Sequence, residues 1–472
     1  MRRFITISLL ILLFSGCASY YKRNQEFQSK VAQGDLEKAE KILLDNKTIQ
    51  RERNRLLFLL NMGYLKHMQQ DFSESNQFFN QADILIEDYG RNYGAEALAL
   101  ISNPEVKPYK AEDFEVVMIH YYKAINFLKL RDFEGALVEA RRMNLVLNRL
   151  NDKYKNHKNR YQADAFAHII MGLAYEASGN INDAFIAYRN AYQVYTNEHG
   201  YFEISVPKQL QLDILRTTYV LGFQNDHLWY KEKFGMEYKH VSQDHGEAVV
   251  IWQNGMGPVK DEWNINFFAV PGEAGYIIFK NEEFGLTFPF YIGDDKDKKN
   301  DLLALKVVRV AFPKYLERPN YFTEAWVESS EDKLPLQVVQ DINAIAFKTL
   351  QDRFLREMGT SLLRLALKKA AEYELSKQNE ALGAIATITN AVTERADTRN
   401  WQTLPHTIAY ARVPLKKGIN TLKLKAKAKD GTIAETSFET YGKMGQMEFI
   451  PYHHLEHLPA ASWDRAATVR VK

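Results

Sequence analysis

The sequence predicts an α + β protein in which a helical first half is followed by a β-rich second half. From Tyr20 to about Gly235, apolar residues recur at helical spacing and short turns separate the segments. From Met236 onward, short β-rich runs such as 248–252 and 302–312 alternate with turns of glycine, proline and charged residues. Hydrophobic residues make up 46% of the chain and aromatic residues 12%, which is typical of a folded protein rather than a disordered one.

The first residues predict a bacterial secretory signal peptide over residues 1–16. Arg2 and Arg3 precede a short apolar run that is too short to span a bilayer. The run ends in 13–17, Leu-Phe-Ser-Gly-Cys, which resembles a lipobox, although phenylalanine replaces the usual leucine three residues before the cysteine. We therefore expect a lipid anchor on Cys17, the alternative being an ordinary signal peptide. Ala18 is not aspartate, and by resemblance to the lipoprotein sorting rules of many bacteria this favours the outer membrane over the inner one. We expect the protein to face the periplasm.

Net charge indicates which class of partner is disfavoured, and cysteine content indicates how the fold is stabilised. Loss of Arg2 and Arg3 with the signal peptide would leave 59 basic residues against 59 acidic ones. A formally neutral chain argues against nucleic acid as a partner. Cys17 is the only cysteine, so an exported form would have no internal disulfide and its fold would depend on packing.

The segment 165–192 shows the helical repeat most clearly. Small residues at Gly172, Ala184 and Ala191 would allow two helices to cross closely, with Tyr188 filling the space beside them, and Gly179-Asn180 would supply the turn between them. This segment resembles the helical hairpin of tetratricopeptide (TPR) repeats. We predict a TPR-like domain over residues 17–235.

Three further hairpins are predicted over residues 25–46, 54–83 and 115–143. Gly63 and Phe79 in the second of these hold the same offset as Gly172 and Tyr188. The spacing between units departs from the regular TPR period of about 34 residues. Segments near 84–113 and 151–161 therefore interrupt the array.

The first helix of each TPR hairpin usually lines the concave face of the array. Applied to this chain, that rule predicts a partner-binding groove for an extended peptide or a helix. Its residues are Tyr64, His67, Tyr121, Lys129, Ile169 and Glu176. The alternative is that several of them are packing residues or solvated surface.

The second half, residues 236–472, predicts an antiparallel β-sandwich with a helical hairpin inserted at about 340–395. Alternating apolar and lysine residues over 422–429 indicate a strand with one buried face. The small, apolar stretch 383–392 favours a buried helix packed on a sheet over a membrane-touching or oligomerising one.

A search for catalytic motifs finds none, and no cofactor site is predicted. His453 and His457 could bind a metal only if their short, proline-bracketed segment were helical, so no metal site is predicted. Residues 252–258 lack the Lys-Ser/Thr of a P-loop and the third glycine of a dinucleotide fold. We expect no enzyme activity, although scattered side chains could still converge in space.

Several stretches of the sequence are unusual. They are 108–109 with 114–122, 138–142, 252–258, and 396–405 with the sequence Ala-Asp-Thr-Arg-Asn-Trp-Gln-Thr-Leu-Pro. Together they resemble an uncharacterised family of bacterial TPR-like envelope lipoproteins. Some members are encoded near a lipoprotein activator of peptidoglycan synthases, which implies a role in the cell envelope. Asp397, Arg399 and Trp401 would either lock the junction between the helical insert and the sandwich or line a ligand cleft there, and we favour the lock.

Three functional hypotheses follow. The first is an outer-membrane lipoprotein that acts as a scaffold for protein partners in an envelope complex. The second is a glycan- or peptidoglycan-binding protein that uses exposed tryptophans of the β domain, with Trp252, Trp263 and Trp401 as candidates. The third is an envelope enzyme without a recognisable motif.

Overall fold

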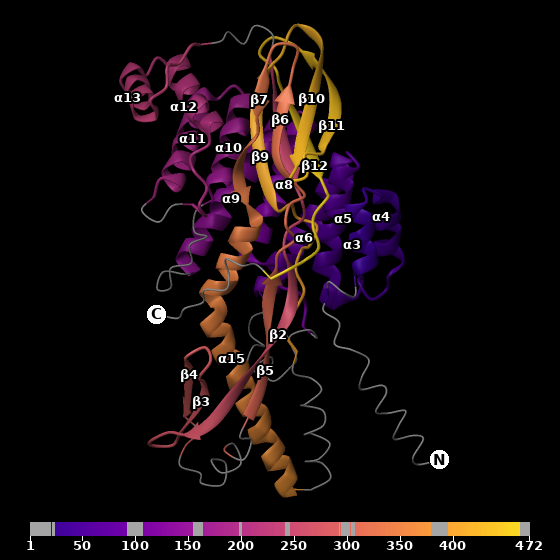
Figure 1. The fold of residues 1–472 in the computed structure, drawn as a ribbon, viewed down its shortest axis with the longest axis vertical. Helices are drawn as coiled ribbons and strands as arrows, with labels where there is room; N and C mark the ends of the chain where they lie inside the picture. The colour runs from indigo at the N-terminus through magenta and orange to yellow at the C-terminus, as the bar shows by residue number, and fades with distance from the viewer. Residues whose placement is uncertain are drawn as a thin grey trace.

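The computed structural model describes residues 20, 24–91, 107–153, 164–197, 201–240, 246–291, 293, 303, 307–378 and 395–462, with side chains omitted at 90–91, 150–153 and 366–378. Helical hairpins form the first half of this chain and three sheets dominate the second half (Figure 1). The α + β class is therefore confirmed. Residues 1–16, Cys17 and the stretch 383–392 lie outside the described residues.

Five helical hairpins follow one another within the described residues. They are α3 (Gln25–Ala32) with α4 (Leu36–Asp45), α5 (Arg55–Met68) with α6 (Phe72–Arg91), α8 (Asp113–Lys129) with α9 (Phe133–Lys153), α10 (Ala165–Ala177) with α11 (Ile181–Tyr195), and α12 (Lys208–Val220) with α13 (Gln224–Phe234). A short 3-10 helix, η1 (Glu52–Asn54), precedes α5. The first four hairpins cover the segments that the sequence predicted, and the fifth was not recognised. No helix among the described residues is both long and apolar enough to cross a bilayer.

The turn of each hairpin repeats one backbone conformation. A residue with positive φ ends the first helix, namely Gly34, Gln70, Arg131, Gly179 and Gly222. The next residue donates its N–H to the carbonyl five positions back, as Asp132 does to Phe127 at 2.9 Å and Asn180 to Tyr175 at 2.8 Å. This is the 6→1 bond of a Schellman motif, which satisfies carbonyls that the helix end leaves free.

Close packing within the hairpins depends on two glycines. A Cβ on Gly63 would lie 2.8 Å from Cε1 of Phe79, and a Cβ on Gly172 would overlap the ring of Tyr188. Phe79 and Tyr188 are fully buried. The helices of these two hairpins therefore pack through the predicted pairing of a small residue with a large ring.

The second half forms three four-stranded sheets. We call β12-β1-β9-β8 the inner sheet, β11-β10-β6-β7 the outer sheet and β4-β3-β2-β5 the distal sheet. The inner sheet contains β1 (Glu247–Asn254), β8 (Gln337–Asp341), β9 (Thr407–Pro414) and β12 (Met447–His454). The outer sheet contains β6 (Phe322–Glu328), β7 (Lys333–Pro335), β10 (Gly418–Ala428) and β11 (Ile433–Gly442). The distal sheet contains β2 (Val259–Pro271), β3 (Tyr276–Asn281), β4 (Leu286–Tyr291) and β5 (Val307–Leu316).

The inner sheet lies between the outer sheet and the helices. Val250 and Trp252 share a core with Leu424 of the outer sheet, whereas Val249 and Ile251 belong to the core of the helical hairpins. All eight residues of β1 are buried, as expected for a strand covered on both faces. Figure 1 shows α3–α5 on one side of these sheets and α10–α13 on the other, so the helical array curves around them.

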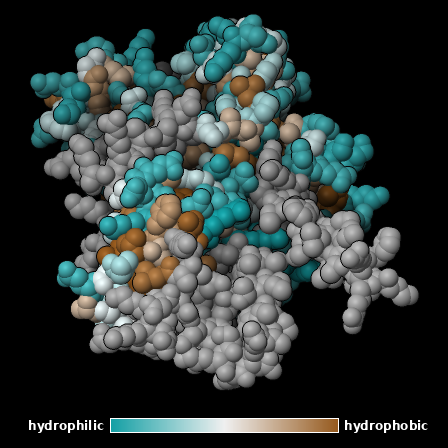
Figure 2. All heavy atoms as spheres, turned by 60° about the horizontal axis from the view of Figure 1, so that its bottom comes forward, coloured by the Kyte–Doolittle hydropathy of each residue, from teal (hydrophilic) through white to brown (hydrophobic). Residues whose placement is uncertain are grey.

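The distal sheet projects from the rest of the molecule together with α15 (Ile342–Gln378), as Figure 1 shows. One face packs on α15 through Phe267, Val310 and Met358. The other face leaves Tyr291 63% exposed and Phe268 49% exposed. Figure 2, which brings this end forward, shows apolar side chains gathered there.

Two details of the predicted second half differ from the structure. The strands β1 and β12 pair in parallel, and the distal sheet is separate from the other two sheets. The predicted helical insert begins as the single helix α15, and residues 379–394, where its second arm was expected, lie outside the described residues. The helices end at Phe234 and β1 begins at Glu247, yet both halves contribute to one continuous core.

Candidate functional site

The predicted concave groove is filled by the chain's own inner sheet. Tyr64, Tyr121 and Ile169 are almost completely buried, and Glu176 is 7% exposed. The Tyr64 hydroxyl contacts Nδ1 of His453 on β12. These four residues therefore do not form an open binding surface, because strands far along the chain cover them.

A buried glutamine of β1 anchors this contact. Gln253 Oε1 accepts a hydrogen bond from the Tyr122 hydroxyl at 2.7 Å and lies 3.3 Å from the Tyr64 hydroxyl. Burial raises the pKa of both phenols well above its ordinary value. Both phenols therefore stay neutral and able to donate. Gln253 and Asn254, two buried polar residues that directly follow the apolar run 248–252 of β1, were the sequence signal that could have revealed this interface.

Glu176 belongs to a buried ion cluster that joins α10 and α12 to β9. Arg412 donates to its two carboxylate oxygens at 2.7 and 3.0 Å, and Arg216 Nη2 donates to Oε2 at 2.7 Å. The Tyr188 hydroxyl donates to the same carboxylate at 2.9 Å. Burial alone would raise the pKa of Glu176, but the two guanidinium groups hold it well below the usual range. The cluster ties the helical array to the inner sheet.

Asp397, Arg399 and Trp401 form a junction lock. Arg399 Nη1 donates to the carbonyls of Arg53 at 2.8 Å and Lys107 at 3.0 Å, while Nη2 donates to Asp397 at 2.7 Å. The geometry therefore matches the locking interpretation, although the locked elements are the segment 395–405 and the helical hairpins. Arg399 also borders a small cavity that is described below.

Trp401 fills the space between the helices and this segment. Its backbone N–H donates to Glu115 at 2.7 Å, and its indole packs against the rings of Tyr64, Phe79 and Tyr122. Only 1% of its surface is exposed. Trp401 is therefore a packing residue.

His67 and Lys129 are the two predicted groove residues that border an open space. They line a cavity of about 880 Å³, which we call the edge groove. It runs between the turn ends of the first three hairpins and the strands β11 and β12. Its lining comprises Gly34, Leu36, His67, Met68, Gln70, Phe72, Lys129, Gln253, residues 436–441, residues 448–453 and Leu455.

Two strand edges lie along the edge groove. Among the described strands, β11 and β12 each end their sheet, so each has one side without a neighbouring strand. Gly255 donates to the carbonyl of His454 at 2.8 Å, so the even-numbered residues of β12 direct their backbone toward β1. The odd-numbered residues Phe449, Pro451 and His453 therefore direct theirs to the free edge. Pro451 has no N–H, which suits an edge position.

Lys129 places a cation in the wall of the edge groove. Its Nζ lies 5.8 Å from the centroid of the Phe72 ring, and burial lowers its pKa from the usual value. No carboxylate of the described residues lies within 4 Å of this amine; the nearby Glu448 pairs with Arg131 at 2.7 Å. A partly buried and unpaired lysine favours a negatively charged group in the groove.

His67 is a polar residue in the wall of the same groove. Its Nδ1 lies 2.6 Å from Oδ1 of Asn126. Burial lowers the pKa of His67 to about 4, so the ring is neutral at physiological pH. It can hydrogen-bond to a partner without adding charge.

The remaining candidate residues are the tryptophans considered for sugar binding and the histidines near 453. Trp252 is 3% exposed, and Trp263 is half-buried and stacks on Phe354, so these rings are not exposed platforms for sugars. His453 lies on β12 rather than on a helix, and its Nε2 donates to the carbonyl of Gly255 at 2.5 Å. Throughout the described part of the chain, no cluster of three or more potential metal ligands occurs.

No family model and no curated protein matches the chain. Among solved structures, the apo form of RapI is similar over 45% of this chain and 68% of its own, with 14% identity and a TM-score of 0.33. MamA is similar over 43% of this chain and 90% of its own, with 15% identity and a TM-score of 0.29. Aspartyl phosphate phosphatase F from Bacillus subtilis is similar over 48% of this chain and 53% of its own, with 16% identity and a TM-score of 0.32. TM-scores this low carry no argument, so the function proposed next depends on the chain's own geometry.

Proposed function

We propose that this protein is a protein-interaction scaffold of the bacterial cell envelope that binds an extended segment of its partner in the edge groove. A lipid on Cys17 holds it at the outer membrane, facing the periplasm, and it belongs with the TPR-like envelope lipoproteins that its sequence resembles. The observation that supports this proposal is the pair of free strand edges, β11 and β12, along one cavity of about 880 Å³.

A segment in extended conformation can add to an exposed sheet edge through its backbone and place alternate side chains in neighbouring pockets. The edge groove offers backbone groups of Phe449 and His453 for this pairing and apolar walls at Leu36 and Phe438. Lys129 selects a partner segment with an acidic side chain close to its apolar residues. The alternative scaffold surface, the concave face of the helices, is occupied by the inner sheet.

The test is photocrosslinking in living cells with a benzophenone amino acid on β11. Tyr441 is 59% exposed and lines the edge groove, whereas Ile433 is 52% exposed at the other end of the same strand and does not line it. We expect a discrete protein adduct from position 441 and not from position 433. Lys129→Glu should abolish that adduct, and Cys17→Ala should release the protein from the membrane fraction. The same adducts from both positions, or none from 441, would refute the proposal.

A further inference from the structure

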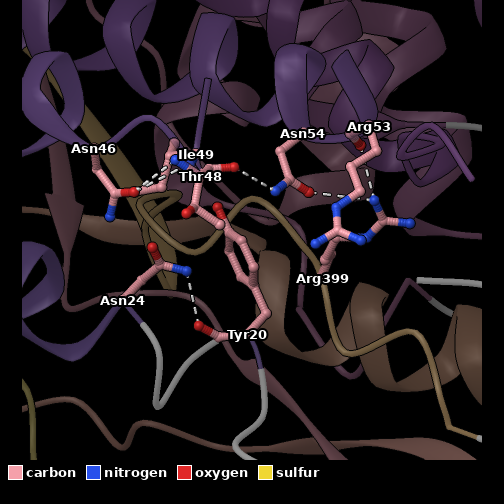
Figure 3. A pocket seen from close by; sticks show the side chains of 8 residues that line it. All are labelled: Tyr20, Asn24, Asn46, Thr48, Ile49, Arg53, Asn54 and Arg399. Carbon is pink, nitrogen blue, oxygen red and sulfur yellow. Dashed lines mark hydrogen bonds between the residues drawn. The ribbon is translucent and has the colours of Figure 1, made fainter. Parts of the chain in front are cut away.

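A second, smaller cavity lies where the beginning of the described chain meets the loop between α4 and α5. Its volume is about 240 Å³, several times the share of one water molecule, which is about 30 Å³. Figure 3 shows the side chains that surround it. They are Tyr20, Asn24, Asn46, Thr48, Ile49, Arg53, Asn54 and Arg399.

Hydrogen bonds within the wall fix most of this lining. Asn24 Nδ2 donates to the carbonyl of Tyr20 at 2.8 Å, and Asn54 Nδ2 donates to that of Thr48 at 3.0 Å. Asn46 Oδ1 accepts the N–H of Thr48 at 3.0 Å. Arg399 is committed to the junction lock described above. The cavity is therefore a preformed space with rigid polar walls.

The cavity wall keeps hydrogen-bond donors that have no acceptor among the described residues, and it contains no acidic side chain. Among the described residues, the Arg53 guanidinium has no carboxylate within 4 Å, and Asn46 Nδ2 has no hydrogen-bond acceptor. None of the eight lining residues is aspartate or glutamate. A half-buried guanidinium facing such a space matches the fork geometry of a phosphate or carboxylate group.

The surrounding loop adds a positive field. The stretch 47–55 contains four basic residues, Lys47, Arg51, Arg53 and Arg55, against the single acid Glu52. Arg51 is exposed and does not line the cavity. The loop therefore attracts anions generally, while Arg53 alone among its basic residues reaches the cavity wall.

The cavity also lies close to the expected lipid anchor. The backbone N–H of Tyr20 donates to Thr398 Oγ1 at 2.8 Å, which fixes the start of the described chain beside the cavity. Cys17 precedes Tyr20 by three residues, so its Cα lies at most about 11 Å away. If Cys17 carries a lipid, as the proposed function requires, the cavity is within reach of the phosphate layer of the membrane.

We propose that this cavity binds a phosphate group through Arg53 and Asn46, supplied by a phospholipid headgroup or by free phosphate. Bidentate hydrogen bonds from the guanidinium hold two phosphate oxygens, and the Asn46 amide donates to a third. With a phospholipid, the site fixes the orientation of the helical array on the membrane to which Cys17 tethers it.

The test uses the full-length lipidated protein purified in maltoside detergent, which contains no phosphate. Hydrogen–deuterium exchange of residues 46–54 would be followed during titration with inorganic phosphate, and again in phospholipid nanodiscs without added phosphate. We expect saturable protection from inorganic phosphate, with affinity at least about tenfold weaker for Arg53→Ala than for the matched variant Arg51→Ala. Protection in nanodiscs that Arg53→Ala abolishes would identify the lipid headgroup as the source, and protection by inorganic phosphate alone would identify the free anion.

Two results would overturn the proposal. One is no protection in either condition, and the other is equal protection of both variants, which would reflect only the basic loop. Mass spectrometry of the purified protein would separately report the lipid on Cys17. A missing lipid would refute the anchor in the proposed function without affecting the phosphate titration in detergent.

Discussion

The substitution Glu176→Gln tests whether the helical array and the inner sheet form one folding unit. In the native cluster, the Glu176 carboxylate receives hydrogen bonds from Arg412 at 2.7 and 3.0 Å and from Arg216 at 2.7 Å. The substitution keeps the size of the side chain and removes its charge. Among the described residues, Asp213 and Glu247 are then the acids left to pair with the two guanidinium groups. Removing one partner of a buried ion pair costs about 3–5 kcal/mol of unfolding free energy. Since glutamine keeps one acceptor oxygen, we expect Glu176→Gln to lower the free energy of unfolding by about 3 kcal/mol, the lower end of this range.

The assay is urea unfolding followed by far-ultraviolet circular dichroism and by tryptophan fluorescence. The matched control is Glu331→Gln, which removes the charge of an exposed pair with Lys416; that substitution should cost at most about 1 kcal/mol. Because the two halves share a core, the two probes should give coincident transitions in the wild type. A cost for Glu176→Gln no larger than that for Glu331→Gln, or separate transitions for the two probes, would refute the reasoning.

Three further predictions concern a buried histidine, the packing within one hairpin and the edge groove. Burial lowers the pKa of His453 from its usual 6.5 to about 3, so only the unfolded chain takes up this proton as the pH falls from about 6.5 to 3. The free energy of unfolding should therefore fall by about 1.4 kcal/mol per pH unit because of this residue. In urea unfolding between pH 6 and 4, the free energy of unfolding of His453→Gln should fall less steeply than that of the wild type, and equal slopes would contradict this. Gly172→Ala should lower the free energy of unfolding by about 1–3 kcal/mol because the new methyl overlaps Tyr188. Gly359→Ala is the control and should not lower it, since its Cβ would lie 3.7 Å from the nearest atom. Thermal unfolding would compare the two variants. Lys129→Ala should leave the unfolding free energy within about 1 kcal/mol of wild type while the crosslink from position 441 disappears, and a large loss of stability would instead make Lys129 a packing residue.

The helical hairpins could be predicted because their signals are local. Gly179-Asn180 supplies both the residue with positive φ and the N-cap, whose side chain accepts the N–H of Asp183 at 3.3 Å. The pairing of Gly172 with Tyr188 is likewise readable within 17 residues of sequence. The hairpin of α12 and α13 was missed because it has the turn glycine Gly222 but not this pairing of a small residue with a large ring.

The site could not be predicted, because residues distant in sequence decide which helix faces stay open. Helical spacing placed Tyr64 and His67 on one face, and the structure agrees that the two rings lie near each other, 6.2 Å between centroids. Helical spacing could not show that His453, 389 residues further along the chain, would cover Tyr64 and leave His67 beside a groove. The free edge of β12 depends in the same way on its parallel pairing with β1, which no local pattern encodes.

Occupation of the concave face by the inner sheet changes what the proposed scaffold can do. An open TPR array can adjust its curvature to a partner, since each repeat contacts only its neighbours. Here Gln253 and Arg412 tie the hairpins of α8 and α10 to the inner sheet. Trp401, in the segment that precedes β9, packs on Phe79 of the α5–α6 hairpin and bonds to Glu115 of α8, so the spacing between the hairpin turns is fixed. The edge groove therefore presents Lys129 and the two strand edges at constant separation, which favours recognition of one register of an extended partner over adaptation to many.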